Sequence, residues 1–200
     1  MLENRTAFIT GINGQDGSYL TELLIDKGYT VVGLVRRLSV PESQTSRLEE
    51  AGVYPHERLH LEYGDLTDES SLMRILSKYR PDEVYNLAAQ SHVRVSFDAP
   101  QFTTDVIARG TLNLLEAVKE IVPQARMYQA GSSEMFGNSI DNDGYQRETT
   151  PMTPVSPYGC AKLYAYNICR TYRESYNLFI SNGILFNHES PRRGGNFVTN

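Results

Sequence analysis

A glycine-rich stretch close to the start of the chain restricts its possible folds more than any other feature. Gly11, Gly14 and Gly17 follow an apolar run at residues 7–9, and apolar residues then recur at helical intervals over residues 18–26. This order predicts a buried strand, a tight turn and a helix. A pyrophosphate can rest on the free N–H groups of such a helix only where no Cβ blocks its approach, and the turn itself needs positive φ. The stretch is therefore typical of a dinucleotide-binding unit.

The rest of the chain alternates between strand-like and helical segments. Strands separated by helices favour parallel pairing with right-handed crossovers, so the predicted fold is α/β, a doubly wound parallel sheet of the Rossmann type with helices on both faces. Strands are predicted at residues 6–10, 30–35, 59–63, 83–87, 126–130 and 178–185. Helices are predicted from residue 18 to about 27, from 67 or 68 to about 78, and at 102–121 and 157–176.

The last predicted strand leads into a polar loop in which the sequence stops. We expect a dinucleotide-binding domain over residues 1–186 and the start of a substrate-binding region over residues 187–200. Because such a loop normally leads to further structure, we interpret the sequence as an N-terminal fragment that lacks most of a C-terminal domain. A fragment of this kind is expected to expose apolar surface where the missing domain packs.

Composition argues against several kinds of partner. The 200 residues carry a net charge of -5, which disfavours nucleic acid and anionic membranes. No apolar run is long enough to span a membrane, and the N-terminus lacks the apolar core of a signal peptide. Cys160 and Cys169 lie nine residues apart in one predicted helix, so reduced thiols in a cytoplasmic protein are expected, and no metal site is expected.

The end of the second predicted strand indicates which dinucleotide binds. NAD-binding units usually carry an acid about 20 residues past the glycines, whereas Val35 and Arg36 stand 18 and 19 residues beyond Gly17. A guanidinium suits a 2′-phosphate, so NADP is favoured over NAD, and a solvated basic loop is the alternative. Asp65 follows the third strand, where it either accepts a bond from the adenine amino group or simply forms a turn.

Two later stretches carry side chains suited to proton transfer. Ser132, Ser133 and Glu134 follow the fifth strand, at the edge where open α/β sheets bind ligands. Tyr158 and Lys162 stand at i and i+4 and therefore share one face of the predicted helix. A nearby ammonium and the positive charge of an oxidised nicotinamide both favour phenolate, so we expect a lowered tyrosine pKa.

Five stretches of this sequence resemble the extended short-chain dehydrogenases/reductases, and within them the nucleotide-sugar dehydratases that act on GDP-mannose. The motifs lie at residues 11–20, 86–93, 132–137, 156–162 and 182–194, and the run at 187–194 is the most specific of them. The resemblance implies conversion of GDP-mannose to GDP-4-keto-6-deoxy-mannose, with tightly bound NADP recycled in each turnover. One departure is Ser132, where the family usually has threonine.

The resemblance also implies roles for individual residues. Tyr158 takes the proton of the sugar's 4-hydroxyl, and Lys162 orients the ribose. Glu134 removes the C5 proton and, with Ser132, helps the C6 hydroxyl to leave as water. The implied cofactor-binding residues are Gly11, Gly14, Gln15, Asp16, Gly17, Arg36, Asp65, Leu66, Leu87, Ala88, Ala89, Tyr158, Lys162, His188 and Arg193. The implied substrate-binding residues are Ser91, Ser133, Glu134, Asn187, Glu189 and Arg192. A homo-dimer or homo-tetramer is also implied, assembled partly through the basic loop at residues 36–46.

Two other functions compete with the dehydratase. A related NADP-dependent nucleotide-sugar epimerase or 4-keto reductase would use Tyr158 and Lys162 without Glu134. A catalytically inactive NADP-binding module would bind the dinucleotide without any turnover. His92, which follows the fourth strand, is a secondary candidate because single histidines at strand ends are more often structural than catalytic.

Overall fold

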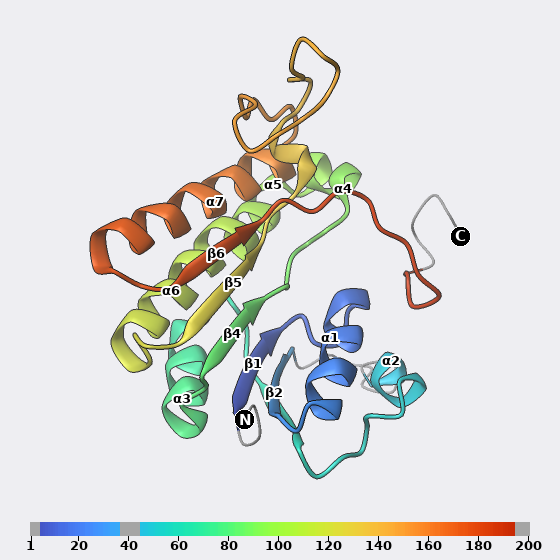
Figure 1. Ribbon diagram of the computed structural model, residues 1–200, viewed down its shortest axis with the longest axis vertical. Helices are drawn as coiled ribbons and strands as arrows, with labels where there is room; N and C mark the ends of the chain where they lie inside the picture. Colours follow the sequence, from blue (N-terminus) through green and yellow to red (C-terminus); the bar gives the residue numbers. More distant parts are fainter. Residues whose placement is uncertain (1–4, 37–44, 195–200) are drawn as a thin grey trace.

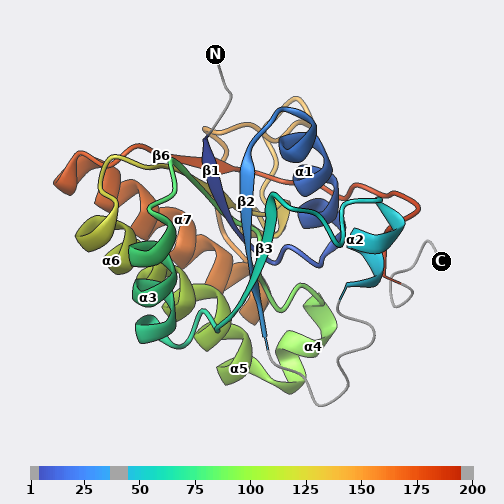
Figure 2. The same ribbon diagram turned by 90° about the horizontal axis from the view of Figure 1, so that it is seen from below.

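A computed structural model describes residues 5–36 and 45–194 of the chain. The strands of these ranges form one parallel sheet in the order β3-β2-β1-β4-β5-β6 (Figures 1 and 2). The strands are β1 (Thr6–Thr10), β2 (Thr30–Val35), β3 (Leu59–Tyr63), β4 (Glu83–Asn86), β5 (Arg126–Ala130) and β6 (Ile180–Gly183). The predicted doubly wound sheet is confirmed. Its strand order reverses between β1 and β4, and the carboxyl ends of these strands mark the place where such sheets bind ligands.

Alternate residues of the central strands face two separate layers of helices (Figure 2). Phe8 and Val32 pack into a core with α3, α6 and α7, whereas Ile9 and Val31 pack on the opposite face with α1 and α2. This period of two, with both faces buried, is what a parallel sheet covered on both sides requires. The helices are α1 (Gln15–Asp26), α2 (Ser46–Glu50), α3 (Glu69–Tyr79), α4 (Val93–Asp98), α5 (Pro100–Thr104), α6 (Gly110–Ile121) and α7 (Pro157–Tyr176).

Side-chain caps fix where two of these helices begin. The Asp68 carboxylate accepts from the backbone N–H groups of Ser70 and Ser71 at the start of α3. The Ser156 hydroxyl accepts from Gly159 N at 3.0 Å at the start of α7, and a proline occupies the first turn. Both caps satisfy N–H groups that lack a partner within the helix. The second cap also fixes the position of Tyr158 in the first turn of α7.

The elements differ from the predictions mainly at their ends. The helices α2 and α4 were not predicted, because five or six residues are too few to show a helical period. The helix predicted at 102–121 begins at Pro100 and contains a π-helical segment, Asp105–Arg109, between α5 and α6. The strands predicted at 83–87 and 178–185 are shorter, because their last residues leave the sheet for the loops at its carboxyl edge.

Three further observations concern the described ranges. None of their helices combines the length and the apolar character needed to cross a membrane. Cys160 and Cys169 are both free thiols, the first exposed and the second buried. No group of three or more histidine, cysteine or acidic residues in these ranges is arranged to hold a metal ion.

Candidate active site

The turn between β1 and α1 is packed against the end of β4. Gly11 has a φ of +71°, and a Cβ there would lie 2.9 Å from the Cα and N atoms of Ala88. A Cβ on Gly17 would lie 2.3 Å from the Gly11 carbonyl oxygen, so both positions require glycine. Gly14 precedes α1 and has no side chain to cover the first N–H groups of the helix. The result is a cradle that fits the pyrophosphate of a dinucleotide.

The residues after β4 lie beside this turn. The backbone N–H groups of Leu87 and Ala88 donate to the Thr10 carbonyl oxygen at 3.2 Å and to Thr10 Oγ1 at 3.1 Å. Ala89 continues the same stretch, and Ser91 follows at an exposed position. Small side chains on this stretch keep the backbone accessible to a ligand at the place between β1 and β4 where the strand order reverses.

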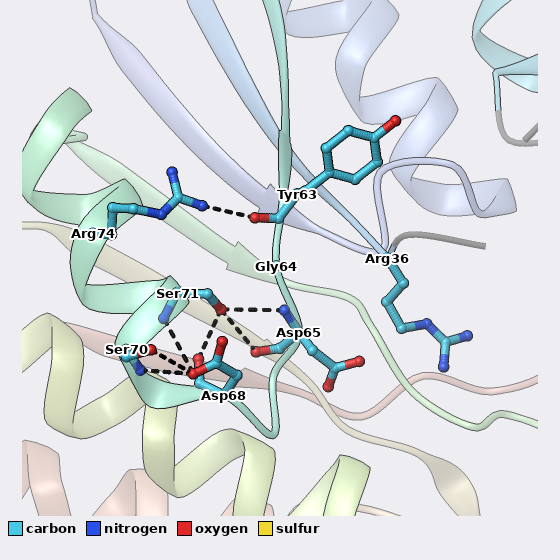
Figure 3. A pocket seen from close by; sticks show the side chains of 8 residues that line it. All are labelled: Arg36, Tyr63, Gly64, Asp65, Asp68, Ser70, Ser71 and Arg74. Carbon is cyan, nitrogen blue, oxygen red and sulfur yellow. Dashed lines mark hydrogen bonds between the residues drawn. The ribbon is translucent and has the colours of Figure 1, made fainter. Parts of the chain in front are cut away.

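A pocket of about 600 Å³ opens at the carboxyl ends of β2 and β3. Figure 3 shows Arg36, directly after β2, and Asp65, after β3, directed toward the same space. The pocket is lined by Arg36, Tyr63, Gly64, Asp65, Asp68, Ser70, Ser71 and Arg74. In a doubly wound sheet this place receives the adenosine end of a dinucleotide, so the pocket is suited to adenosine with a charged substituent. The basic loop expected to assist assembly continues into residues 37–44, which lie outside the described residues.

Asp65 and Leu66 also have structural contacts. One carboxylate oxygen of Asp65 accepts from the backbone N and the Oγ1 of Thr67, both at 2.8 Å. This is the turn that the sequence offered as an alternative for Asp65, and it holds the carboxylate at the pocket wall. The Leu66 side chain is buried in the core, so only its backbone is available to a ligand.

Ser132, Glu134, Tyr158 and Lys162 come together where β5 ends and α7 begins. The Ser132 hydroxyl lies near enough to the Tyr158 hydroxyl to lower the pKa of that phenol, and Ser132 Oγ accepts from Glu134 N at 3.2 Å. A Cβ on Gly159 would lie 2.7 Å from the Glu134 carbonyl oxygen, so glycine lets the first turn of α7 approach the 3-10 turn Ser133–Met135. The predicted residues therefore form one compact cluster at the carboxyl edge of the sheet.

Burial dominates the electrostatics of this cluster. It raises the pKa of Tyr158, which is 8% exposed, while the hydrogen bond from Ser132 and the charge of Arg193 lower that pKa. Burial also lowers the pKa of Lys162 to about 8. The expected lowering of the tyrosine pKa is thus not found. The physical reason is the burial of the Tyr158 hydroxyl, which outweighs the influences that lower its pKa. Lys162 Nζ donates to the Ala130 carbonyl at 2.9 Å and lies 5.7 Å from the centre of the Tyr158 ring.

A buried chain of polar side chains leads from the glycine turn to this lysine. Thr10 Oγ1 donates to Asn86 Oδ1 at 2.6 Å, and Asn86 Nδ2 donates to Gln129 Oε1 at 2.7 Å. Gln129 Nε2 then donates to the Ala130 carbonyl at 3.3 Å, the same oxygen that holds Lys162. Buried polar groups need partners of this kind. The network was missed in the sequence because its members come from three separate strands.

The π-helical segment Asp105–Arg109 packs against α7. Ile107 and Ala108 form an apolar cluster with Tyr158, Ala161 and Ala165 of α7. Such segments are frequent at functional sites, since the extra residue per turn redirects side chains. Nothing in the local sequence distinguishes this stretch from ordinary α-helix, so the packing of Tyr158 could only be learned from the structure.

The polar segment after β6 runs back toward the start of α1, as Figure 1 shows. His188 Nε2 lies 2.8 Å from an oxygen of Asp16, and its backbone oxygen accepts from Gln15 Nε2 at 3.1 Å. Ser190 Oγ donates to the amide oxygen of the same side chain, Gln15 Oε1, at 3.0 Å. The segment thereby joins His188 to the predicted cofactor residues Gln15 and Asp16, more than 170 positions away in the sequence.

The remaining residues predicted in this segment have different surroundings. Arg193 contacts Glu189, with 3.3 Å between Nε and Oε2, and its charge acts on Tyr158 and His188. Asn187 and Glu189 are exposed. Arg192 instead lies against α1, where its guanidinium pairs with Glu22. The pKa of His188 is raised, first by its bond to the Phe186 carbonyl and then by Asp16.

Comparison with known proteins places the chain among GDP-mannose dehydratases. A family model described as GDP-mannose 4,6 dehydratase matches residues 8–200. Similar curated proteins are the GDP-mannose 4,6-dehydratases of Yersinia enterocolitica (54% identical over 200 residues) and Homo sapiens (53% over 201). These alignments cover 98% and 96% of this chain but 53% and 52% of the relatives. The chain therefore spans about half the length of the curated relatives that it matches.

Solved structures share the fold at lower identity. A dTDP-glucose 4,6-dehydratase from Streptomyces venezuelae, with NAD and TYD bound, superimposes with a TM-score of 0.80 at 27% identity, covering 94% of this chain and 57% of that one. A UDP-N-acetylglucosamine 4-epimerase from Methanobrevibacter ruminantium gives 0.84 at 26%, covering 98% and 59%. Dehydratases and epimerases thus share this scaffold. Because the family model matches nearly the whole sequence, this chain belongs to the GDP-mannose 4,6-dehydratase family.

Proposed function

We propose that this chain carries the dinucleotide-binding and catalytic part of a GDP-mannose 4,6-dehydratase, which forms GDP-4-keto-6-deoxy-mannose and water. The main support is the cluster of Ser132, Glu134 and Tyr158 at the same carboxyl edge of the sheet as the glycine turn, in a chain about half identical to curated dehydratases of that name. A carboxylate in this cluster is what separates dehydration from epimerisation or simple reduction, because dehydration needs a base at C5.

We propose NADP as the cofactor. The glycine turn is a cradle for the pyrophosphate, and the pocket beside it presents Arg36 where a 2′-phosphate would lie. Asp65 lies in the same pocket for the adenine, and the backbone at residues 87–89 borders the nicotinamide side. When bound, the dinucleotide would supply hydride chemistry at this site, as an acceptor toward C4 of the sugar and a donor toward C6.

The residues of the chain then handle the protons. Tyr158, as phenolate, accepts the proton of the 4-hydroxyl, and Lys162 orients the ribose from its buried position on α7. The 4-ketone acidifies the C5 proton, which the Glu134 carboxylate removes. The same proton leaves with the C6 hydroxyl as water, assisted by the Ser132 hydroxyl. Return of hydride to C6 is matched by a proton at C5, which balances the proton that Tyr158 took from the 4-hydroxyl. Ser91, Ser133, Asn187 and Glu189 remain the proposed contacts to the sugar nucleotide, and residues 187–200 the proposed start of the substrate-binding region.

Incubation of the full-length protein with NADP and GDP-mannose tests this proposal. Mass spectrometry should show loss of one water from the nucleotide sugar. Glu134→Gln should abolish that loss while reduced dinucleotide still forms, since only the C5 step is blocked. Glu148→Gln, at an exposed position in the loop before α7, is the matched control and should dehydrate normally. A C4 epimer without water loss would identify an epimerase, and NADP binding without any turnover would identify an inactive module.

A further inference from the structure

The segment at residues 187–193 belongs to no helix or strand, so side-chain contacts must hold it in place. Two groups of contacts do so. The first joins His188 and Ser190 to Gln15 and Asp16, all of them near the cradle for the pyrophosphate. The second lies farther along α1 and centres on Arg192, whose guanidinium contacts side chains of that helix.

Arg192 is held on both its charged edge and its flat face. Its Nη2 lies 2.7 Å from Glu22 Oε2, and the guanidinium carbon lies 3.9 Å from the centre of the Tyr19 ring. Tyr19 and Glu22 are one helical turn apart and therefore share one face of α1. The side chain of Arg192 is only 10% exposed. A planar guanidinium suits this combination of a ring face and a carboxylate, whereas an ammonium does not.

Arg47, from the start of α2, completes the second group. Its Nε donates to the Arg192 carbonyl oxygen at 2.9 Å, and its Nη1 donates to the Asn13 carbonyl oxygen at 3.1 Å. Asn13 belongs to the glycine turn. One guanidinium therefore joins the turn to the segment that crosses it, and two donors at a fixed angle are needed for both bonds.

We propose that Arg192 and Arg47 are positioning residues, which clamp the segment at residues 187–193 across the glycine turn and so hold His188 and Arg193 at the dinucleotide site. This inference rests on the proposed function, because it assigns the segment to the binding of NADP. It gives Arg192 a different role from the substrate contact expected from the sequence. The clamp slows the release of the dinucleotide, as recycling of one bound cofactor requires.

The rate of NADPH dissociation from the full-length protein tests the clamp. We expect Arg192→Leu to raise this rate about tenfold, because the segment loses its anchor on α1. Arg47→Met should act in the same direction. Neither Arg192→Lys nor Arg47→Lys should restore the slow rate, since lysine keeps the charge but not the planar fork. Arg170→Leu removes an exposed arginine from a similar pair with Glu174 on α7 and should leave the rate unchanged.

A double-mutant cycle distinguishes a clamp from a general loss of stability. Glu22→Gln removes the charge of the more exposed partner in the Arg192–Glu22 ion pair, and it should raise the NADPH dissociation rate by itself. When Glu22→Gln is combined with Arg192→Leu, the NADPH dissociation rate should hardly rise further, because both substitutions break the same ion pair. Amide exchange should accelerate over residues 188–193 in these variants and stay unchanged in α6. Independent, multiplicative effects of the two substitutions would overturn the clamp.

The alternative role for Arg192 gives a different result. If Arg192 bound the substrate's phosphate, Arg192→Leu would raise the KM for GDP-mannose, Arg192→Lys would restore it, and NADPH dissociation would not change. That result would overturn the clamp and leave the dehydratase intact. A protein that shows the expected dissociation rates but never dehydrates GDP-mannose would instead support the clamp and refute the proposed function.

Discussion

Opposing influences act on the hydroxyl of Tyr158, and their balance decides the pH at which it can serve as a base. Burial raises its pKa, and the hydrogen bond from Ser132 lowers it. Ser132→Ala should therefore raise the pKa further and reduce the phenolate fraction at neutral pH. We expect the acid limb of the kcat/KM profile for dehydration to move to higher pH. The rate at neutral pH should fall about tenfold for every pH unit by which that limb moves.

The pH profile of the full-length protein is the measurement for this prediction. Ser181→Ala, at an exposed position in β6, is the matched control and should leave the profile in place. A Ser132→Ala profile that is scaled down without moving would show that the hydroxyl acts only on the leaving group.

Lys162 carries a second pH dependence, which appears in stability. Its pKa is lowered from 10.5 to about 8 because it is buried. Between these values the unfolded chain holds a proton that the folded chain has released, so the free energy of unfolding rises with pH. Relative to Lys162→Met, the free energy of unfolding of the parent protein should increase by roughly 3 kcal/mol as the pH rises through this window. Below pH 8 the parent should be least stable relative to the variant.

Urea unfolding of both proteins on either side of this window measures the difference. Lys27→Met, which replaces an exposed lysine at the end of α1, is the control and should show a difference from the parent that stays nearly constant. A constant difference for Lys162→Met as well would mean that the ammonium is solvated in the folded state.

At the scale of elements, the connection between β1 and α1 combines a conformational and a steric requirement. Gly11 and Gly52 have nearly the same φ, +71° and +70°, but only Gly11 faces a neighbour within 4 Å. Gly52→Ala should cost about 1–2 kcal/mol of stability from the left-handed backbone alone. Gly11→Ala should cost about 2 kcal/mol more and weaken NADP binding, because its Cβ would meet the backbone of Ala88.

Denaturant unfolding and NADP titration of the two variants separate these contributions. Equal losses of stability would show that the loop at Ala88 moves aside without cost. The comparison works because the two glycines share a backbone conformation and differ in what surrounds them.

The elements themselves were largely predictable. The positions of the strands and the starts of α3 and α7 follow from apolar runs and capping residues that are local in the sequence. The short helix α4 could not be predicted because six residues are too few to show a helical period, and the π-helical segment Asp105–Arg109 could not be predicted because its packing against α7 is not visible in the local pattern.

At the scale of the molecule, the chain covers about half of its curated relatives, and this suggests a comparison of two lengths. We expect the 200-residue chain to bind NADP, because the cradle and the pocket lie within it. Dehydration of GDP-mannose should require a protein as long as the curated relatives, because this chain matches only 53% and 52% of the length of two of them. Titration with NADP and detection of water loss, for both lengths, check the two expectations, and full activity of the shorter chain would contradict the second.

The expected homo-dimer or homo-tetramer stays a prediction at this scale. Light scattering on the full-length protein would measure its mass, and a monomer that dehydrates GDP-mannose at an ordinary rate would refute the need for assembly.

The sequence by itself determined the alternation of strands and helices, the glycine turn, and the shared helical face of Tyr158 and Lys162. Each of these depends on residues a few positions apart, where spacing alone determines geometry. Only the tertiary structure decided that His188 meets Asp16, that Arg192 lies on α1, and that burial raises the pKa of Tyr158. These depend on which distant segments pack together, and packing sets both the contacts and the local polarity that a linear pattern does not contain.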